Sequence, residues 1–169
     1  PGDAFCICRR FHTIDQILMR MLKESDNLYA ESMFYQLAAS TGTKHASAKQ
    51  ARGIINKLIS KVGLNPKRYE IADGSGLSLY NYLSAELEVQ LLRYAFRNNN
   101  IYMHLRPSLP IAGEDGTLRK RMKGVFTAGN VHAKTGTVQG VSSLAGYCTA
   151  ANGHHLASAP CCGGRSFFF

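Results

Sequence analysis

The sequence predicts an α/β fold in which helices come first and a short, mainly antiparallel sheet follows. Apolar residues recur at helical spacing between residues 14 and 62, whereas the segment 131–138 alternates and is rich in Val and Thr. The chain has 169 residues, of which 45% are hydrophobic and 18% charged. This length and composition are typical of one globular domain. No apolar run approaches the roughly 18 residues of a membrane-spanning helix, so we expect none.

Three helices are expected in the first part of the chain. Apolar side chains follow the i, i+3, i+4, i+7 pattern from Ile14 to Leu22 and again from Ala30 to Ala38, with a break at residues 24–26. The segment Ala51–Val62 repeats the pattern, and Gly63 is expected to end it because glycine favours helix C-termini. Each of these segments should therefore bury one face.

A turn and a fourth helix follow. Asp73–Gly76 is rich in turn residues, and Ser84 is expected to cap a helix that continues to about Arg97. The three asparagines at 98–100 are expected to stop that helix.

Two strands and a hairpin turn are expected after residue 130. The segments 131–138 and 142–149 are predicted strands joined by a turn at Gln139–Gly140. Asn152–Gly153 is a strong two-residue hairpin signal. The chain from 155 to 164 is nevertheless poor strand material, so a third strand is only weakly supported.

Net charge raises a nucleic-acid interpretation. The formal charge is +9, and the densest basic run is Arg119-Lys120-Arg121 with Lys123. No aromatic residues alternate with this run, so a base-stacking surface is not indicated. A solvated turn is favoured, and no nucleic-acid partner is expected.

The five cysteines do not form a metal or disulfide pattern. Cys6, Cys8, Cys148, Cys161 and Cys162 include no C-x-x-C pair, so neither a zinc ribbon nor a thioredoxin-type site is expected. We expect no metal and no cofactor.

Two motifs can carry chemistry together. Ser25-Asp26-Asn27 places a hydroxyl and an amide on a loop between helices, although Ser25 or Asp26 could equally cap the second helix. Lys134-Thr135-Gly136-Thr137 lies on a predicted strand. There the lysine would supply a positive field for a carboxylate, the glycine would allow close approach, and backbone N–H groups could pair with an extended peptide and a developing oxyanion.

The ordered set of motifs resembles a known family. A Ser-Asp-Asn motif followed by Lys-Thr-Gly is typical of β-lactamases and penicillin-binding proteins. The chain is similar to the D-alanyl-D-alanine carboxypeptidase/endopeptidase family, the low-molecular-mass class C penicillin-binding proteins of the DacB type. The resemblance covers about Ile14 to Gly153 and rests on Ser25–Glu31, Asp73–Ser78, Ser108–Gly113, Asp115–Leu118 and Ala133–Thr137.

The resemblance implies a β-lactamase/penicillin-binding-protein (transpeptidase-like) fold and an acyl-enzyme mechanism. It implies peptidoglycan peptides ending in D-Ala-D-Ala as substrate, β-lactams as ligands of the intact enzyme, and a periplasmic location. The alternatives are a class A β-lactamase-like hydrolase, a basic binding module and a non-catalytic peptide-binding remnant. The Glu-x-x-Leu-Asn segment of class A β-lactamases is absent between Asn27 and Lys134, which disfavours the first.

Carried onto this sequence, the resemblance implies these residue roles. Ser25 would relay protons to the leaving D-alanine, Asn27 would bind the substrate amide, and Lys134 would hold the electrostatic field. Thr135, Gly136 and Thr137 would bind the substrate carboxylate, with the N–H of Thr137 in the oxyanion hole. Asp73, Gly74, Ser75 and Gly76 would form a structural loop near the site.

Three departures from the family pattern qualify the expectation. No Ser-x-x-Lys occurs, so the nucleophile is missing and the chain resembles a C-terminal fragment that is inactive alone. Leu79 replaces an arginine that binds the substrate side-chain carboxylate in some members, which puts a diaminopimelate preference in doubt. Residues 1–157 are expected to form the carboxypeptidase-like part, and 158–169 an irregular tail of the kind a frameshift produces. No signal peptide is expected at the start.

Overall fold

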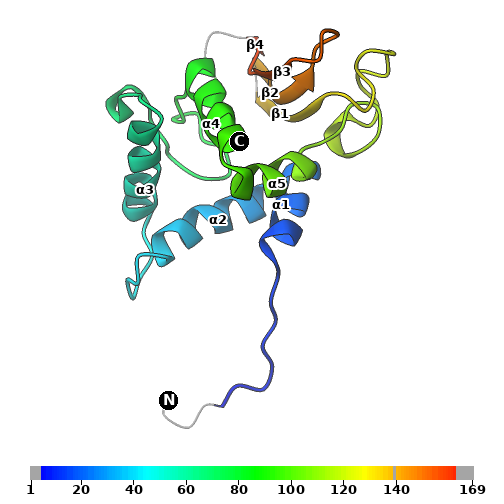
Figure 1. Cartoon of the computed structure of the whole chain (residues 1–169). Coiled ribbons are helices and arrows are strands. Elements are labelled where there is room, and N and C mark those ends of the chain that lie inside the picture. The colour runs from blue at the N-terminus through cyan, green and yellow to red at the C-terminus, as the bar shows by residue number, and fades with distance from the viewer. Residues whose placement is uncertain (1–4, 139, 163–169) are drawn as a thin grey trace.

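A layer of helices packs against a small antiparallel sheet (Figure 1). The computed structural model describes residues 5–138 and 140–162. Residues 5–12 run as an extended segment away from the helices, at the opposite end of the view from the sheet. In the described part of the chain, no helix is both long enough and apolar enough to cross a bilayer.

The first two helices form a hairpin around the expected break. Helix α1 (Ile14–Lys23) begins with a capping box in which Thr13 and Gln16 each bind the other's backbone N–H. Helix α2 (Asn27–Ala39) begins at Asp26, whose carboxylate accepts hydrogen bonds from the N–H groups of Leu28 and Tyr29. The helices confirm the predicted pattern, and the cap is Asp26 rather than Ser25.

The third and fourth helices are also confirmed. Helix α3 (Ala48–Lys61) begins with a Ser47–Gln50 capping box, and Gly63 follows it with φ +88°. Helix α4 (Ala85–Arg97) is capped by Ser84, as the sequence predicts. Two short 3₁₀ turns, η1 (Pro66–Arg68) and η2 (Gly116–Leu118), connect longer elements.

The asparagine run ends α4, as the sequence predicts, but a further helix that the sequence analysis did not predict follows directly. Helix α5 (Asn99–Ser108) starts immediately after α4. Asn98 is extended and serves both helices, because its N–H donates to Ala95 and its carbonyl accepts from Ile101 and Tyr102. One residue outside the helical region is enough to end one helix and begin another.

Within residues 5–138 and 140–162 the sheet has four strands. Strand β1 (His132–Val138) pairs antiparallel with β2 (Val141–Thr149), with Lys134 opposite Ala145. Strands β3 (His155–Ser158) and β4 (Cys161–Cys162) both pair with β2. Of the predicted Gln139–Gly140 turn, Gln139 lies outside the described residues and Gly140 has φ +80°.

Strands β3 and β4 correct the sequence expectation for the tail. The Asn152–Gly153 turn returns the chain along β2, and pairing with β2 stabilises a sequence of low intrinsic strand preference. The proposed boundary at residue 158 falls within β3, and the expected irregular tail contains β4. The tail from residue 163 onward lies outside the described residues.

A buried cluster joins the sheet to the helices. Leu22 of α1, Leu92 of α4, Leu109 and Tyr147 of β2 pack together. The Tyr147 hydroxyl donates to the Leu92 carbonyl at 2.8 Å, so the large side chain is also satisfied as a donor. This cluster fixes β1 and β2 beside the end of α1.

Candidate active site

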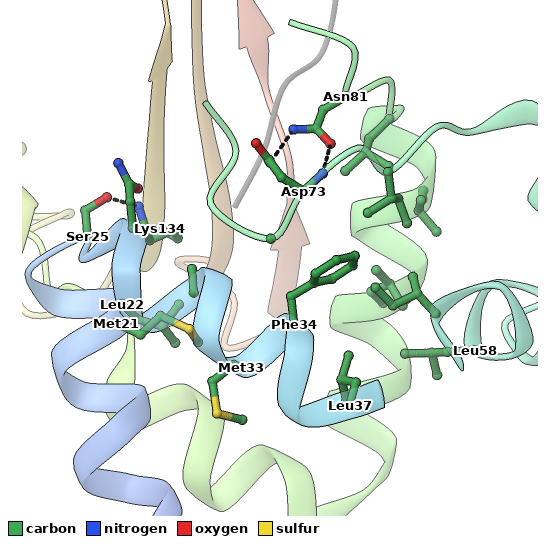
Figure 2. A pocket seen from close by; sticks show the side chains of 18 of the residues that line it. Met21, Leu22, Ser25, Met33, Phe34, Leu37, Leu58, Asp73, Asn81 and Lys134 are labelled. Atoms are coloured by element: carbon green, nitrogen blue, oxygen red, sulfur yellow. Dashed lines mark hydrogen bonds between the residues drawn. The ribbon is translucent and has the colours of Figure 1, made fainter. Parts of the chain in front are cut away.

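The structure brings Ser25 and Lys134 into direct contact. Lys134 Nζ donates to Ser25 Oγ at 2.7 Å, although 109 positions separate the two residues. Ser25 lies in the loop between α1 and α2 with φ +55°, a left-handed conformation that is unusual for serine. The strained backbone turns its hydroxyl toward β1. Figure 2 shows the pair at one end of a larger cavity.

Burial changes the acid–base behaviour of Lys134. The residue is 8% exposed, and loss of solvation lowers its pKa from 10.5 to about 8. Its ammonium also donates to the carbonyl of Thr135. A lysine with this pKa can hold a positive field and still exchange a proton near neutral pH.

The three motifs line one cavity of about 100 Å³. Its wall combines residues of the Ser-Asp-Asn loop, the glycine-rich turn and β1: Ser25, Asn27, Ser75, Gly76, Leu77, Lys134, Thr135, Gly136, Thr137 and Val138. All six expected catalytic and substrate-binding residues therefore meet. Of the expected structural loop, Ser75 and Gly76 line this cavity, whereas Asp73 and Gly74 line the larger neighbouring one.

Asp73 organises the glycine-rich turn from within. Its carboxylate accepts hydrogen bonds from the N–H groups of Gly76 and Ser78 and from the side-chain amide of Asn81. Asn81 is buried, and its side-chain carbonyl accepts hydrogen bonds from the N–H of Ala72 and from the N–H of Asp73, the second of which Figure 2 shows. These bonds hold the turn in one conformation beside Lys134.

Glu31 attaches the same turn to helix α2. Its carboxylate accepts hydrogen bonds from the N–H groups of Gly74 and Ser75 at 2.7 and 2.9 Å. A Cβ on Gly74 would lie 2.4 Å from the Cβ of Phe34, so this close approach requires glycine. The turn and the Ser-Asp-Asn loop are thus positioned by one helix.

One edge of β1 faces away from the rest of the sheet. The Ala133 N–H donates to the Pro110 carbonyl on that edge. Because successive residues of a strand direct their backbone groups to alternate sides, the N–H groups of Thr135 and Thr137 point to the same edge. Among the described strands none pairs with β1 there, since β2 occupies the opposite edge.

A second set of contacts connects β1 and the segment before it to η2 and to the end of α1. The Thr135 hydroxyl donates to the Thr117 hydroxyl of η2 at 2.9 Å. Asp115 accepts from the Ile111 N–H and forms an ion pair with Lys23 at the end of α1. Lys23 also donates to the Leu109 carbonyl at 2.9 Å, so it holds the segment before β1 against the helix that precedes Ser25.

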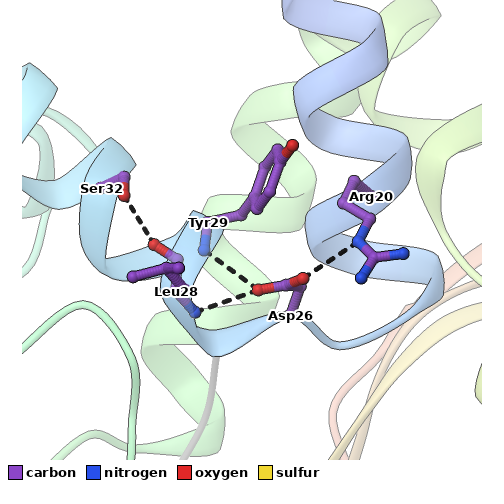
Figure 3. A network of polar contacts seen from close by, with 5 residues as sticks. All are labelled: Arg20, Asp26, Leu28, Tyr29 and Ser32. Carbon is purple, nitrogen blue, oxygen red and sulfur yellow. Dashed lines mark hydrogen bonds and ion pairs between the residues drawn. The ribbon is translucent and has the colours of Figure 1, made fainter.

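Asp26 acts as a helix cap and not as part of the cavity wall of the three motifs. Besides capping α2, its carboxylate forms a 3.0 Å ion pair with Arg20 of α1 (Figure 3). The backbone hydrogen bond from Tyr29 and the bond from Arg20 lower the pKa of Asp26 below its usual value.

Sequence reasoning assigned no role to several supporting residues. Glu31 and Thr117 lie within the motifs that carry the resemblance, while Asn81 and Lys23 lie outside them. Glu31, Thr117 and Lys23 act on partners that are distant in sequence, so local pattern gives little signal. Within residues 5–138 and 140–162, no group of three or more His, Cys, Asp or Glu could hold a metal ion.

A larger, mostly apolar cavity of about 360 Å³ adjoins the Ser25–Lys134 pair (Figure 2). Side chains from α1, α2, α3 and α4 line it, including Met21, Met33, Phe34, Leu37 and Leu58. Ser25 and Lys134 belong to the walls of both cavities. The polar site therefore opens directly onto an apolar space between the helices.

This combination of fold and motifs defines a penicillin-binding class of protein. Residues 10–162 match the model of the D-Ala-D-Ala carboxypeptidase 3 (S13) family. The chain belongs to this family. The match reaches Cys162, so it includes β3 and β4, where sequence inspection found no resemblance.

Curated relatives agree with the family assignment. The chain is 35% identical over 147 residues to D-alanyl-D-alanine carboxypeptidase DacB of Haemophilus influenzae, covering 85% of this chain and 30% of the relative. It is 34% identical to a D-alanyl-D-alanine carboxypeptidase of Actinomadura sp., covering 79% of this chain and 26% of the relative. The chain thus spans about a third or less of these relatives.

Solved structures confirm the fold. Penicillin-binding protein 4 (DacB) from Haemophilus influenzae superposes with a TM-score of 0.81 at 34% identity, covering 89% of this chain and 33% of that chain. An extended-spectrum β-lactamase superposes with a TM-score of 0.62 at 24% identity, covering 92% and 57% of the respective chains. The second likeness concerns the fold alone, and the expected transpeptidase-like fold is confirmed.

Proposed function

We propose that this chain forms the Ser-Asp-Asn and Lys-Thr-Gly walls of a serine-type D-Ala-D-Ala carboxypeptidase/endopeptidase. The observation that carries the proposal is the 2.7 Å contact between Lys134 Nζ and Ser25 Oγ beside the open edge of β1. Family membership supports the reaction class. The substrates are peptidoglycan peptides ending in D-Ala-D-Ala, the intact enzyme binds β-lactams, and the site of action is extracytoplasmic, in the periplasm.

The open edge of β1 suits an extended peptide. A substrate lying antiparallel to β1 pairs with the outward N–H of Thr135 and Thr137. The Thr137 N–H also serves the developing oxyanion, and an oxyanion donor typically lowers the barrier by about 3–4 kcal/mol. The hydroxyls of Thr135 and Thr137 bind the terminal carboxylate in the field of Lys134, and Gly136 leaves room for it.

Ser25 and Asn27 act from the opposite wall. The Ser25 hydroxyl accepts a proton from Lys134 or returns one, which suits a relay to the leaving D-alanine. Asn27 lines the same cavity and its amide holds the substrate peptide group. Asp73 to Gly76 form a supporting turn whose glycine end borders the cavity.

The acylating serine belongs to a segment outside these 169 residues. No Ser-x-x-Lys occurs in the sequence. The alternative of a β-lactamase-like hydrolase finds support only in a likeness of fold. We therefore expect the chain to lack acylation activity by itself and to contribute binding groups when joined to the missing nucleophile.

A chimera tests this assignment. The chain is inserted in place of the matching third of Haemophilus influenzae DacB, which supplies its own nucleophile. We expect covalent labelling of the chimera by a fluorescent penicillin, loss of at least about a hundredfold in labelling rate with Lys134→Ala, and an unchanged rate with Lys49→Ala, an exposed lysine of α3. A folded chimera that is labelled equally well with Lys134→Ala contradicts the proposal, as does labelling of the isolated chain.

A further inference from the structure

The loop between η2 and β1 presents a cluster of unpaired cations. Arg119, Lys120, Arg121 and Lys123 are all exposed. Across the described residues, none of the four forms an ion pair or a side-chain hydrogen bond. Asp115, the residue before η2, is already paired with Lys23. We call residues 119–126 the cationic loop.

Two apolar side chains form the end of the cationic loop. Val125 is 95% exposed and Phe126 is 83% exposed. A single exposed apolar residue is ordinary, but two adjacent ones at nearly full exposure beside four cations are not explained by core packing. In Figure 1 the loop lies at the side of the molecule beyond α5 and the sheet.

Hydrogen bonds hold the cationic loop in a defined shape. The Gly113 N–H donates to the Arg121 carbonyl at 2.9 Å. The Thr127 hydroxyl donates to the Met122 carbonyl at 2.7 Å, and the N–H groups of Thr127 and Ala128 both donate to Gly124. Val125 and Phe126 therefore protrude from a braced turn.

This combination fits an anionic lipid surface. Lys and Arg attract phosphate headgroups, while adjacent apolar side chains enter the boundary between headgroups and acyl chains. A soluble polyanion would use the cations but not Val125 and Phe126. An apolar protein groove would use Val125 and Phe126 but not four cations.

We propose that the cationic loop binds the surface of anionic lipid bilayers, with Val125 and Phe126 inserted among the headgroups. The surface is separate from the cavity of the three motifs, because no residue from 119 to 126 lines that cavity. The binding would hold this part of the protein at a membrane surface.

The absence of tryptophan gives a direct test in the 169-residue chain. Phe126→Trp introduces one fluorophore at the end of the loop. We expect its emission to shift to the blue with vesicles of phosphatidylglycerol and phosphatidylcholine in equal parts, but not with phosphatidylcholine alone. Leu79→Trp, on an exposed loop with no adjacent cations, is the matched control and should show no shift.

Vesicle sedimentation separates the two contributions. We expect at least about a tenfold loss of binding when the four cations become Gln, because they supply the electrostatic attraction to the anionic headgroups. A comparable loss is expected with Val125→Ser/Phe126→Ser. Circular dichroism spectra that match the parent chain verify that each variant is folded.

Three outcomes would overturn the proposal. The first is an unshifted spectrum of Phe126→Trp with anionic vesicles. The second is full binding of Val125→Ser/Phe126→Ser, which would indicate a soluble polyanion as the partner. The third is loss of binding only with Phe5→Ser/Phe11→Ser, which would assign the effect to the extended segment 5–12 with Arg9 and Arg10.

Discussion

At the scale of single residues, the Ser25–Lys134 pair is where strain and burial coincide. Ser25 holds a left-handed backbone and Lys134 loses most of its solvation. Both conditions cost stability, and both are typical of functional sites, where the surrounding structure over-determines the conformation. The titration of Lys134 in this pair is therefore a property of the site that can be measured.

Lys134 is expected to titrate far below an ordinary lysine. Burial lowers its pKa to about 8, so about half of the molecules carry a neutral amine at that pH. NMR of the chain with labelled lysine side chains should show a midpoint near 8 for the signal that Lys134→Arg removes. A midpoint for Lys134 above 10 would contradict the buried geometry.

The lowered pKa of Lys134 should also make the stability of the chain depend on pH, with stability rising as the pH rises. Because the folded-state pKa of Lys134 is lower than the unfolded value, folding favours the neutral amine. The contribution of Lys134 to the free energy of unfolding is most favourable above pH 10.5, where the amine is neutral in both states. It is lost as the pH falls toward 8. A functional group at this position thus opposes stability at neutral pH.

Glu88 gives an opposite pH dependence on helix α4. It is 8% exposed, neither carboxylate oxygen has a hydrogen-bond partner among the described residues, and burial raises its pKa from 4.5 to about 9. Folding favours the neutral acid. The contribution of Glu88 to stability is therefore complete below pH 4.5 and is lost as the pH rises toward 9. Glu88→Gln should stabilise the chain by roughly 2–3 kcal/mol at pH 7 and by little at pH 4.5. Urea unfolding at the two pH values measures the difference, and an equal effect at both would contradict a buried neutral acid.

A pair of glycine substitutions tests the close contact between the glycine-rich turn and α2. Gly74→Ala should destabilise the chain by about 1–3 kcal/mol, because its Cβ would lie 2.4 Å from the Cβ of Phe34. Gly53→Ala is the matched control, since nothing lies within 4 Å of the added Cβ in α3. It should stabilise by about 0.5–1 kcal/mol through helix propensity. Denaturant unfolding measures both changes in the free energy of unfolding. Changes of the same sign for the two variants would show that the turn does not pack against α2.

At the scale of elements, Lys23 joins α1 to the segment that leads into β1. Its ammonium contacts both Asp115 and the Leu109 carbonyl. Lys23→Met and Asp115→Asn should therefore be non-additive, with a coupling of about 1–2 kcal/mol, because the pair is only partly exposed. A double-mutant cycle by urea unfolding measures it. The Arg20–Asp26 pair, whose arginine is more exposed, should give a smaller coupling from Arg20→Met and Asp26→Asn; a larger one would reverse this ranking.

Elements with strong local signals were predictable from the sequence. Helical periodicity located α1 to α3, and Ser84 located the start of α4 because serine is a favoured N-cap residue. In the structure its hydroxyl accepts a hydrogen bond from the Leu87 N–H. Helix α5 was missed because Asn98 both ends and begins a helix. Strand β3 received only weak support from the sequence, because its stability comes from pairing with β2 rather than from the strand preference of its own residues.

The motifs of the site were predictable, but their supports were not. Ser25 and Lys134 could be named from their surroundings in sequence, whereas their contact depends on the packing of Leu22, Leu92 and Tyr147. Glu31 and Thr117 act on residues that are 43 and 18 positions away. No periodicity or cap signal records such pairings.

At the scale of the whole molecule, one cavity is polar and the other is apolar, and they share Ser25 and Lys134. The chain spans about a third or less of its curated relatives, so much of their structure has no counterpart here. An apolar cavity of about 360 Å³ is large for a close-packed interior. The nucleophile-bearing segment is proposed to approach the site from outside this chain.

Asp26 links the helical hairpin to the geometry of Ser25. A single carboxylate begins α2 and holds Arg20 of α1, and Ser25 is the residue immediately before it. Fraying of either helix would release the strained serine together with the cap. Amide hydrogen exchange at the start of α2 should therefore report how often this cap opens, and so for what fraction of the time the Ser25 hydroxyl stays beside Lys134.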